Sequence, residues 1–177
     1  MLADLIGSVE NKEDVLMYKK IVAQGRFYEE FGAILQENGL IPEDVTEVRK
    51  FAKEATFSAF FASNFDIRWI SAMQHFKATF PNVYAVFSEI KYVVKGTKKS
   101  DKVHSALSVS LQALEAEIFL NKICKRISET NPNIPIFTIH DSVITTIEHE
   151  NTVKQIVEEE IFKSIAVYPE LNIEKWE

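Results

Sequence analysis

The sequence has little of three residue types that cross-link or interrupt a chain. Among its 177 residues there is a single cysteine, Cys124, so no disulfide can form within the chain and nothing indicates an oxidising compartment. There are only 5 glycines and 5 prolines, and no internal repeat. These absences exclude a disulfide-braced miniprotein and predict long secondary-structure elements.

Two further absences concern membranes and charge. No apolar run reaches the roughly 18 to 20 residues that span a bilayer, and the first fifteen residues turn acidic too early for a signal peptide. We therefore expect a soluble, cytoplasmic protein without a membrane partner. The net charge of −6 argues against a free-standing nucleic-acid-binding module, because such modules carry an excess of Lys and Arg.

What the sequence does have is enough apolar residues, 46% of the total, for a core. Apolar residues recur at helical spacing over most of the first 130 positions. The pattern predicts two helices within 12–38, separated at Gly25 and stopped at 38–39, and further helices over 43–62, 65–81, 82–94 and 103–127. The last of these should be a long buried helix, with its apolar face formed by Leu107, Leu111, Leu114, Ile118 and Ile123.

The last fifty residues have a different pattern. A turn at 131–135 precedes two β-branched segments, 136–139 and 143–147, which predict a hairpin with a polar tip. A helix over 150–168, ended by Pro169, and a closing strand over 171–176 follow. The expected class is α+β, with a mostly helical region over 1–100 and a region over 101–177 that contains a small antiparallel sheet.

The first candidate functional group lies on the helix predicted over 43–62. Arg49, Lys53, Phe57 and Phe61 recur every four residues and therefore share one helix face. Cations one turn apart can hold a polyphosphate, and aromatic rings further along can contact a sugar and stack on a base. The alternative is ordinary amphipathicity, with both phenylalanines in the core and the cations at its solvated edge.

The second candidate group is His140-Asp141-Ser142 at the tip of the predicted hairpin. A carboxylate held between two strands is well placed to bind a hard cation such as Mg²⁺, with His140 as its neighbour. The alternative is a turn in which Asp141 bonds to its own backbone.

The third candidate group is a polar stripe on the helix predicted over 103–127. Its members are Ser105, Ser108, Gln112 and Glu115. Short side chains allow another backbone to approach, and Gln bonds base edges in a minor groove. A plain solvated face is the alternative interpretation.

In their order along the chain, these three groups together resemble the family A DNA polymerases. The helix R-x3-K-x3-F-x3-F is similar to the family's motif B, and His140-Asp141-Ser142 is similar to motif C, which reads HDE in most of these enzymes and HDS in the related single-subunit RNA polymerases. The segment 111–117 between them resembles the family's glutamine helix. The resemblance covers residues from Arg49 to the carboxyl terminus, and it implies the fingers and the carboxyl-terminal part of the palm.

The resemblance implies roles around an incoming deoxynucleotide and a template–primer. Arg49 and Lys53 would hold the triphosphate, Phe57 would face the sugar, and Phe61 would lie beside the nascent base pair. The implied reaction is nucleotidyl transfer to a primer 3′ end with two Mg²⁺ ions.

The remaining implied roles belong to the later motifs. Gln112, with Ser108 on the same stripe, would contact the template–primer minor groove. His140 would approach the primer terminus, and Asp141 would be a ligand of Mg²⁺. A basic segment would contact backbone phosphates, unless it is simply a solvated loop; it comprises Lys91, Lys95, Lys98, Lys99 and Lys102.

Departures from the family pattern limit what the resemblance implies. Ala62 stands where motif B has glycine, and Phe61 where it has tyrosine. Phe57 is the DNA-polymerase choice and Ser142 the RNA-polymerase choice; we favour DNA, because Phe57 would face the sugar. The family's second metal-binding aspartate, in motif A, has no counterpart that we can identify.

One carboxylate is insufficient for two Mg²⁺ ions, so we expect little or no activity from the chain alone. Three explanations compete: a portion of a longer polymerase, a split subunit whose partner supplies motif A, or a decayed remnant. The alternative from another class is a non-catalytic α+β interaction domain.

Overall fold

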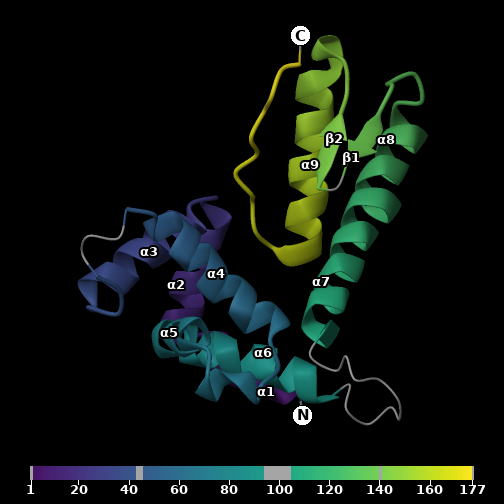
Figure 1. The fold of residues 1–177 in the computed structure, drawn as a ribbon. Helices are drawn as coiled ribbons and strands as arrows, with labels where there is room; N and C mark the ends of the chain where they lie inside the picture. Colours follow the sequence, from purple (N-terminus) through teal and green to yellow (C-terminus); the bar gives the residue numbers. More distant parts are fainter. Residues whose placement is uncertain (1, 43–45, 94–104, 140, 177) are drawn as a thin grey trace. The chain divides into compact units, whose positions relative to one another are not determined.

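The computed structural model describes residues 2–42, 46–93, 105–139 and 141–176. It is 71% helical, and its described part contains a two-stranded antiparallel sheet, which confirms the α+β class (Figure 1). The chain divides into two compact units, Met1–Ser110 and Leu111–Glu177, and each is described by itself.

The first unit is helical in its described residues. Two of the predicted boundaries are confirmed: Gly25 and Gly39 have φ angles of 66° and 64°, a conformation that glycine adopts without strain, and each follows a helix. The elements of this unit are α1 (Leu2–Val9), α2 (Glu13–Ala23), α3 (Phe27–Glu37), α4 (Val48–Phe61), η1 (Asp66–Arg68), α5 (Ser71–Thr79), α6 (Pro81–Val93) and the start of α7 (Ala106–Ala116).

Two predicted helices of this unit have other bounds. The helix predicted over 43–62 begins at Val48, because Thr46 and Glu47 form a turn; residues 43–45 lie outside the described part. The segment predicted as a helix over 65–81 holds the short 3₁₀ turn η1 and then α5. Pro81 starts α6, the position where its fixed φ and missing N–H cost nothing.

The core of the first unit is aromatic. Phe31, Phe76 and Phe80 are fully buried, and the Phe76 ring lies within 6.5 Å, centroid to centroid, of five other rings. Those rings belong to Tyr18, Phe31, Phe60, Phe80 and Phe87. Helices α2 to α6 therefore pack around one aromatic cluster.

Glycine also fixes the place of α4. A Cβ atom at Gly32 of α3 would lie 2.5 Å from Cγ1 of Val48, so only glycine allows the start of α4 to pack this closely. The fully buried residues of α4 are small, Ala52, Ala55, Thr56 and Ala59, and Phe60 beside them reaches the aromatic cluster. The opposite side of this helix is left for other contacts.

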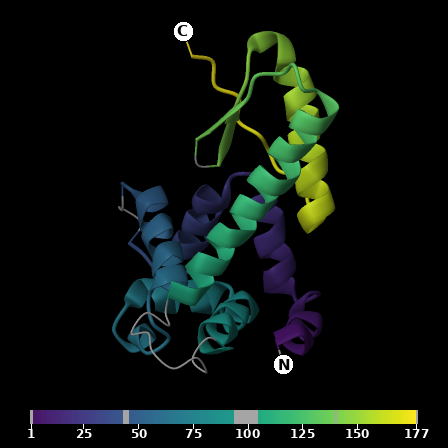
Figure 2. The same cartoon turned by 90° about the vertical axis from the view of Figure 1, so that its right-hand side faces the viewer.

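The second unit packs one continuous helical segment against α9. The segment comprises α7, a π-helical stretch η4 (Glu117–Cys124) and α8 (Lys125–Thr130). Figures 1 and 2 show α9 (Glu150–Ile165) running beside η4 and α8. Isoleucine and valine fill the contact: Ile118, Ile123 and Ile127 from the segment, and Val153, Ile156, Val157 and Ile161 from α9.

The hairpin lies between α8 and α9 in sequence. Strands β1 (Phe137–Ile139) and β2 (Ser142–Ile144) pair antiparallel, with Ile139 opposite Ser142, and the 3₁₀ turn η5 (Ile147–His149) follows. The hairpin prediction is confirmed, although both strands are shorter than the predicted segments.

Three predictions for the second unit are wrong. The helix predicted over 103–127 is not buried throughout, since Leu111 and Leu114 are 39% and 47% exposed. Helix α9 ends at Ile165, before Pro169, because Ala166 adopts a left-handed conformation with φ 55°. The closing strand is absent, since the described residues 171–176 pair with no strand.

An ion-pair cluster joins α8 to α9 and makes the second unit sensitive to acid. Arg126 donates to Glu159 at 2.6 Å and to Glu160 at 2.7 Å. Hydrogen bonds from Gln155 and Arg126 lower the pKa of Glu159, and those from Lys163 and Arg126 lower the pKa of Glu160. Depressed carboxylate pKa values stabilise the fold above pH 4.5, and this stabilisation is lost as pH falls through the lower, folded-state values.

We therefore expect Arg126→Gln to lower the urea midpoint at pH 7 and to flatten the loss of stability below pH 4.5. Lys125→Gln is the matched control, because Lys125 is 3.9 Å from Glu129 on an exposed surface and should change neither quantity measurably. Urea titrations across the acid range measure both. If stability fell equally below pH 4.5 in Arg126→Gln and in the unmodified chain, the acid sensitivity would not come from the Arg126 ion pairs.

Candidate nucleotide-binding face of α4 and its surroundings

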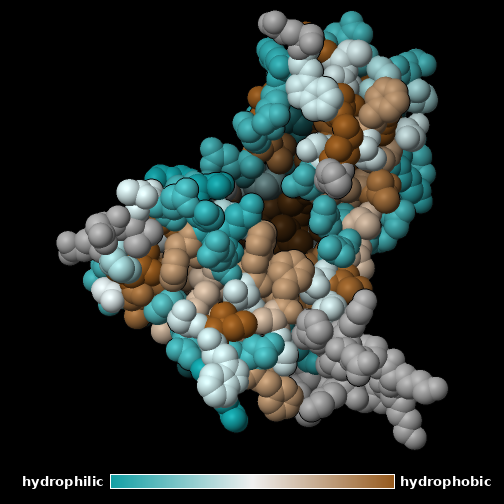
Figure 3. Space-filling model, viewed as in Figure 1, coloured by the Kyte–Doolittle hydropathy of each residue, from teal (hydrophilic) through white to brown (hydrophobic). Residues whose placement is uncertain are grey.

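Helix α4 presents the predicted stripe to solvent. Phe57 and Phe61 are 40% and 45% exposed, although both are phenylalanines on a helix whose other side is buried. Their rings meet edge to face, 5.7 Å apart. Figure 3 shows apolar side chains exposed over α4. The interpretation of Phe57 and Phe61 as core residues is therefore wrong, because alanines occupy that place.

The two cations of the stripe have different surroundings. The Nζ atom of Lys53 lies 5.4 Å from the centre of the Phe57 ring, and no ion pair is seen for it among the described residues. Arg49 donates from Nε to Glu29 of α3 at 2.7 Å and lies over the Tyr28 ring. Hydrogen bonds from a backbone amide and from Arg49 lower the pKa of Glu29, so this pair is charged at neutral pH.

The C-terminal end of α4 is held by a buried lysine. Lys91 of α6 is 3% exposed, and its Nζ donates to the carbonyl oxygens of Ala59 and Ala62 at 2.5 and 2.8 Å. A cation here complements the negative end of the helix dipole. The expectation that Lys91 belongs to a phosphate-contacting basic segment is therefore wrong: its ammonium group fixes the end of the candidate helix.

The hairpin offers one candidate metal ligand. Asp141 is exposed directly before β2, and His140 lies outside the described residues. In the described part of the chain, no three His, Cys, Asp or Glu side chains are grouped as a metal ion would require. The described residues thus place a carboxylate at the predicted position and do not by themselves fit a two-ion site.

The polar stripe of α7 is divided by burial. Ser108 is 8% exposed and its hydroxyl donates to the carbonyl oxygen of Ser105, so it is engaged within its own helix. Gln112 and Glu115 are exposed. Gln112 therefore stays a candidate nucleic-acid contact. Lys95, Lys98, Lys99 and Lys102 lie outside the described residues.

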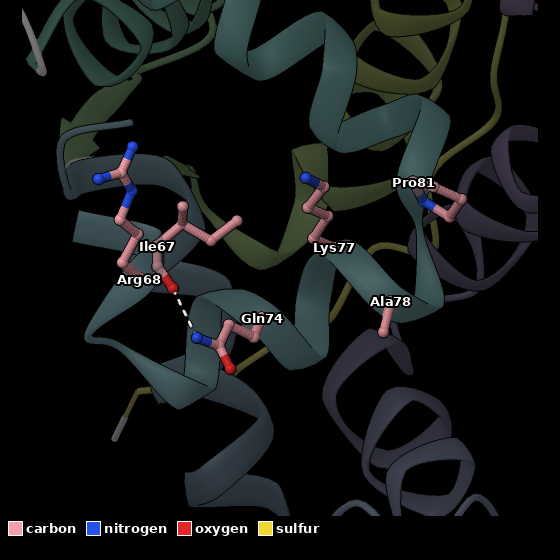
Figure 4. A pocket seen from close by; sticks show the side chains of 6 residues that line it. All are labelled: Ile67, Arg68, Gln74, Lys77, Ala78 and Pro81. Carbon is pink, nitrogen blue, oxygen red and sulfur yellow. Dashed lines mark hydrogen bonds between the residues drawn. The ribbon is translucent and has the colours of Figure 1, made fainter. Parts of the chain in front are cut away.

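The first unit also has a depression that the sequence pattern did not predict. It has a volume of about 510 Å³ and lies over η1, α5 and the start of α6 (Figure 4). Its lining comprises Ile67, Arg68, Gln74, Lys77, Ala78 and Pro81. The signal in the sequence is the dipeptide Arg68-Trp69, a cation beside an aromatic residue within the helix predicted over 65–81.

Comparisons with protein-family models, with curated proteins and with solved structures find no match to this chain. Within the described residues, no helix combines the length and the apolar character needed to cross a membrane.

Proposed function

We propose that this chain is a fingers and palm portion of a template-directed DNA polymerase of the family A type, and that it acts in the cytoplasm. In this proposal it binds a deoxynucleoside triphosphate on α4 and a template–primer through Gln112 and the hairpin. The observation that carries the proposal is the solvent-exposed row of Arg49, Lys53, Phe57 and Phe61 along α4.

The chemistry of this row suits a nucleotide better than a core or a plain solvated edge. With 40% and 45% of their surface exposed, Phe57 and Phe61 each forgo part of the roughly 1.5 to 3 kcal/mol that full burial contributes, so a ligand is a reasonable explanation for their retention. A triphosphate would reach Lys53 directly, and Arg49 by exchanging Glu29 for a phosphate oxygen. The Phe57 and Phe61 rings would then contact the sugar and the base.

A complete catalytic centre requires more carboxylates than the described residues supply. In the proposal Asp141 contributes one carboxylate, and a further polymerase segment or a partner subunit contributes the carboxylate of motif A. The resident Mg²⁺ ions belong to that completed site. The chain's own share of the reaction is to bind and orient the nucleotide and the primer terminus.

The hairpin supports the need for a partner. Phe137 and Ile139 of β1 are 71% and 47% exposed, which leaves apolar side chains of a short sheet uncovered. A strand added to such an edge would pair its backbone groups and cover these side chains. This observation also favours the second candidate function, a non-catalytic interaction domain.

Lys53→Ala is expected to weaken binding of a fluorescent deoxynucleoside triphosphate about tenfold or more, because it removes a charge-assisted contact worth about 1.5 to 3 kcal/mol. Lys50→Ala is the matched control: Lys50 lies on the same helix, is paired with Glu47 at 2.9 Å and is outside the row. Fluorescence titration with magnesium present measures both.

The control variant should bind like the unmodified chain. Equal nucleotide affinity for Lys53→Ala and Lys50→Ala would remove the assignment of α4. In that case the interaction-domain function would be favoured, since neither substitution should affect a surface elsewhere.

A further inference from the structure

The depression over η1, α5 and α6 is positively charged in a chain whose net charge is −6. Arg68 and Lys77 line it, and none of its six lining residues is acidic. Figure 4 shows the side chains of Arg68 and Lys77 pointing in the same direction, with Ile67 between them. Two cations beside an apolar floor are suited to an anion that also carries an apolar part.

Among the described residues, neither cation of the depression has an acidic partner. No ion pair is seen for Arg68 or Lys77 within the described ranges, and Lys77 instead lies 5.7 Å from the Tyr84 ring. The Nε2 atom of Gln74 donates to the carbonyl oxygen of Ile67 at 2.8 Å, which fixes η1 against α5 (Figure 4). Both cations are thus available to bind an anion, and the backbone of η1 that carries Arg68 is fixed to α5.

An exposed tryptophan stands next in sequence to a lining residue of the depression. Trp69 follows Arg68 directly and is 85% exposed, the highest value among the large hydrophobic side chains of the described residues. A hydrogen bond from its backbone N–H to the carbonyl oxygen of Asp66, at 2.8 Å, holds its position after η1. An indole ring on a fixed backbone gives a flat stacking surface.

We infer that this depression and Trp69 form a binding site for single-stranded nucleic acid. Arg68 and Lys77 contact successive phosphates, and an unpaired base stacks on Trp69. A duplex keeps its bases stacked on one another, so it gains the phosphate contacts and not the indole contact. The inference rests on the proposed function and adds a place where the unpaired strand is held on the first unit.

The test uses the full chain carrying Trp176→Phe, so that Trp69 is the only tryptophan. A fluorescein-labelled oligothymidylate is titrated, and anisotropy and tryptophan fluorescence are recorded at several salt concentrations. Binding should quench Trp69. The double variant Arg68→Gln/Lys77→Gln should bind at least tenfold more weakly, and its salt slope should fall by about 1.4, as expected for two phosphate contacts on a single strand.

Trp69→Ala, tested by anisotropy alone, should lose about tenfold in affinity for the oligothymidylate and little for a duplex of equal length. Lys20→Gln, which removes one exposed charge from α2 outside the lining, is the control and should change affinity less than twofold. Circular dichroism confirms that each variant is folded.

Three results would overturn the inference: unchanged affinity of the double variant, unchanged Trp69 fluorescence on binding, or equal loss of duplex and single-strand binding in Trp69→Ala. Failure of the proposed function is distinguishable. If Lys53→Ala leaves nucleotide binding intact while the double variant loses the oligothymidylate, only the proposed function fails. If the nucleotide result holds and the oligothymidylate results do not, only this inference fails.

Discussion

Phe76→Ala is expected to lower the free energy of unfolding of the first unit by about 3 to 5 kcal/mol, the range for truncating a buried phenylalanine. Phe76 is fully buried, and its ring is in contact distance of five others, so the remaining rings cannot close the cavity without moving together. Urea titration followed by circular dichroism measures the change, and hydrogen exchange assigns it to residues of that unit.

Phe57→Ala is the matched control, with the same two residue types exchanged on the exposed face of α4. Because Phe57 is already 40% exposed, its truncation is expected to cost less than about 1 kcal/mol while weakening nucleotide binding. Equal losses of stability for Phe76→Ala and Phe57→Ala would mean that Phe57 is a core residue after all. The candidate nucleotide face would then have no basis.

The stability of the first unit is expected to increase as pH rises above about 8, which is the reverse of ordinary alkaline behaviour. Burial lowers the pKa of Lys91 from 10.5 to about 8, opposed in part by the carboxylate of Asp66. Between these two values the unfolded chain holds a proton that the folded chain has released, so the free energy of unfolding rises with pH. At about 1.4 kcal/mol per pKa unit, the total is up to about 3 kcal/mol.

Lys91→Met is the variant that isolates this effect, because it keeps the aliphatic length and removes the titrating group. Its stability should stay level over the same pH range, whereas Lys20→Met, at an exposed position, should retain the rise. The range should end near pH 10, since burial also raises the pKa of Tyr18, and ionising that phenol would favour unfolding. A rise that persists in Lys91→Met would show that another group is responsible.

The fold was predictable where local chemistry decides the outcome. Gly25 and Gly39 end helices because glycine tolerates a positive φ, and the valines and isoleucines of α9 recur at a spacing that only a helix places on one face. The end of α9 was mispredicted, because Pro169 is the obvious stop signal and Ala166 carries none.

The candidate site was predictable only in part. Spacing showed that Arg49, Lys53, Phe57 and Phe61 share a face, and it could not show which face of α4 is buried. The fully buried positions of α4 are mostly alanines, and because alanine is only weakly hydrophobic, the sequence did not mark that face as the buried one. The role of Lys91 was equally hidden, because its acceptors, the carbonyl oxygens of Ala59 and Ala62, lie at the end of another helix.

The π-helical stretch Glu117–Cys124 changes how positions along its segment are to be counted. Each of its hydrogen bonds joins residues five apart, whereas those of an α-helix join residues four apart. Each residue of the stretch therefore turns the chain about the helix axis by a smaller angle than an α-helical residue does. Positions before and after it are therefore out of phase with a fixed helical period. An alignment to a relative with a regular α-helix at this place needs a gap within the stretch, and without one it pairs the polar side of α7 with the wrong side of α8.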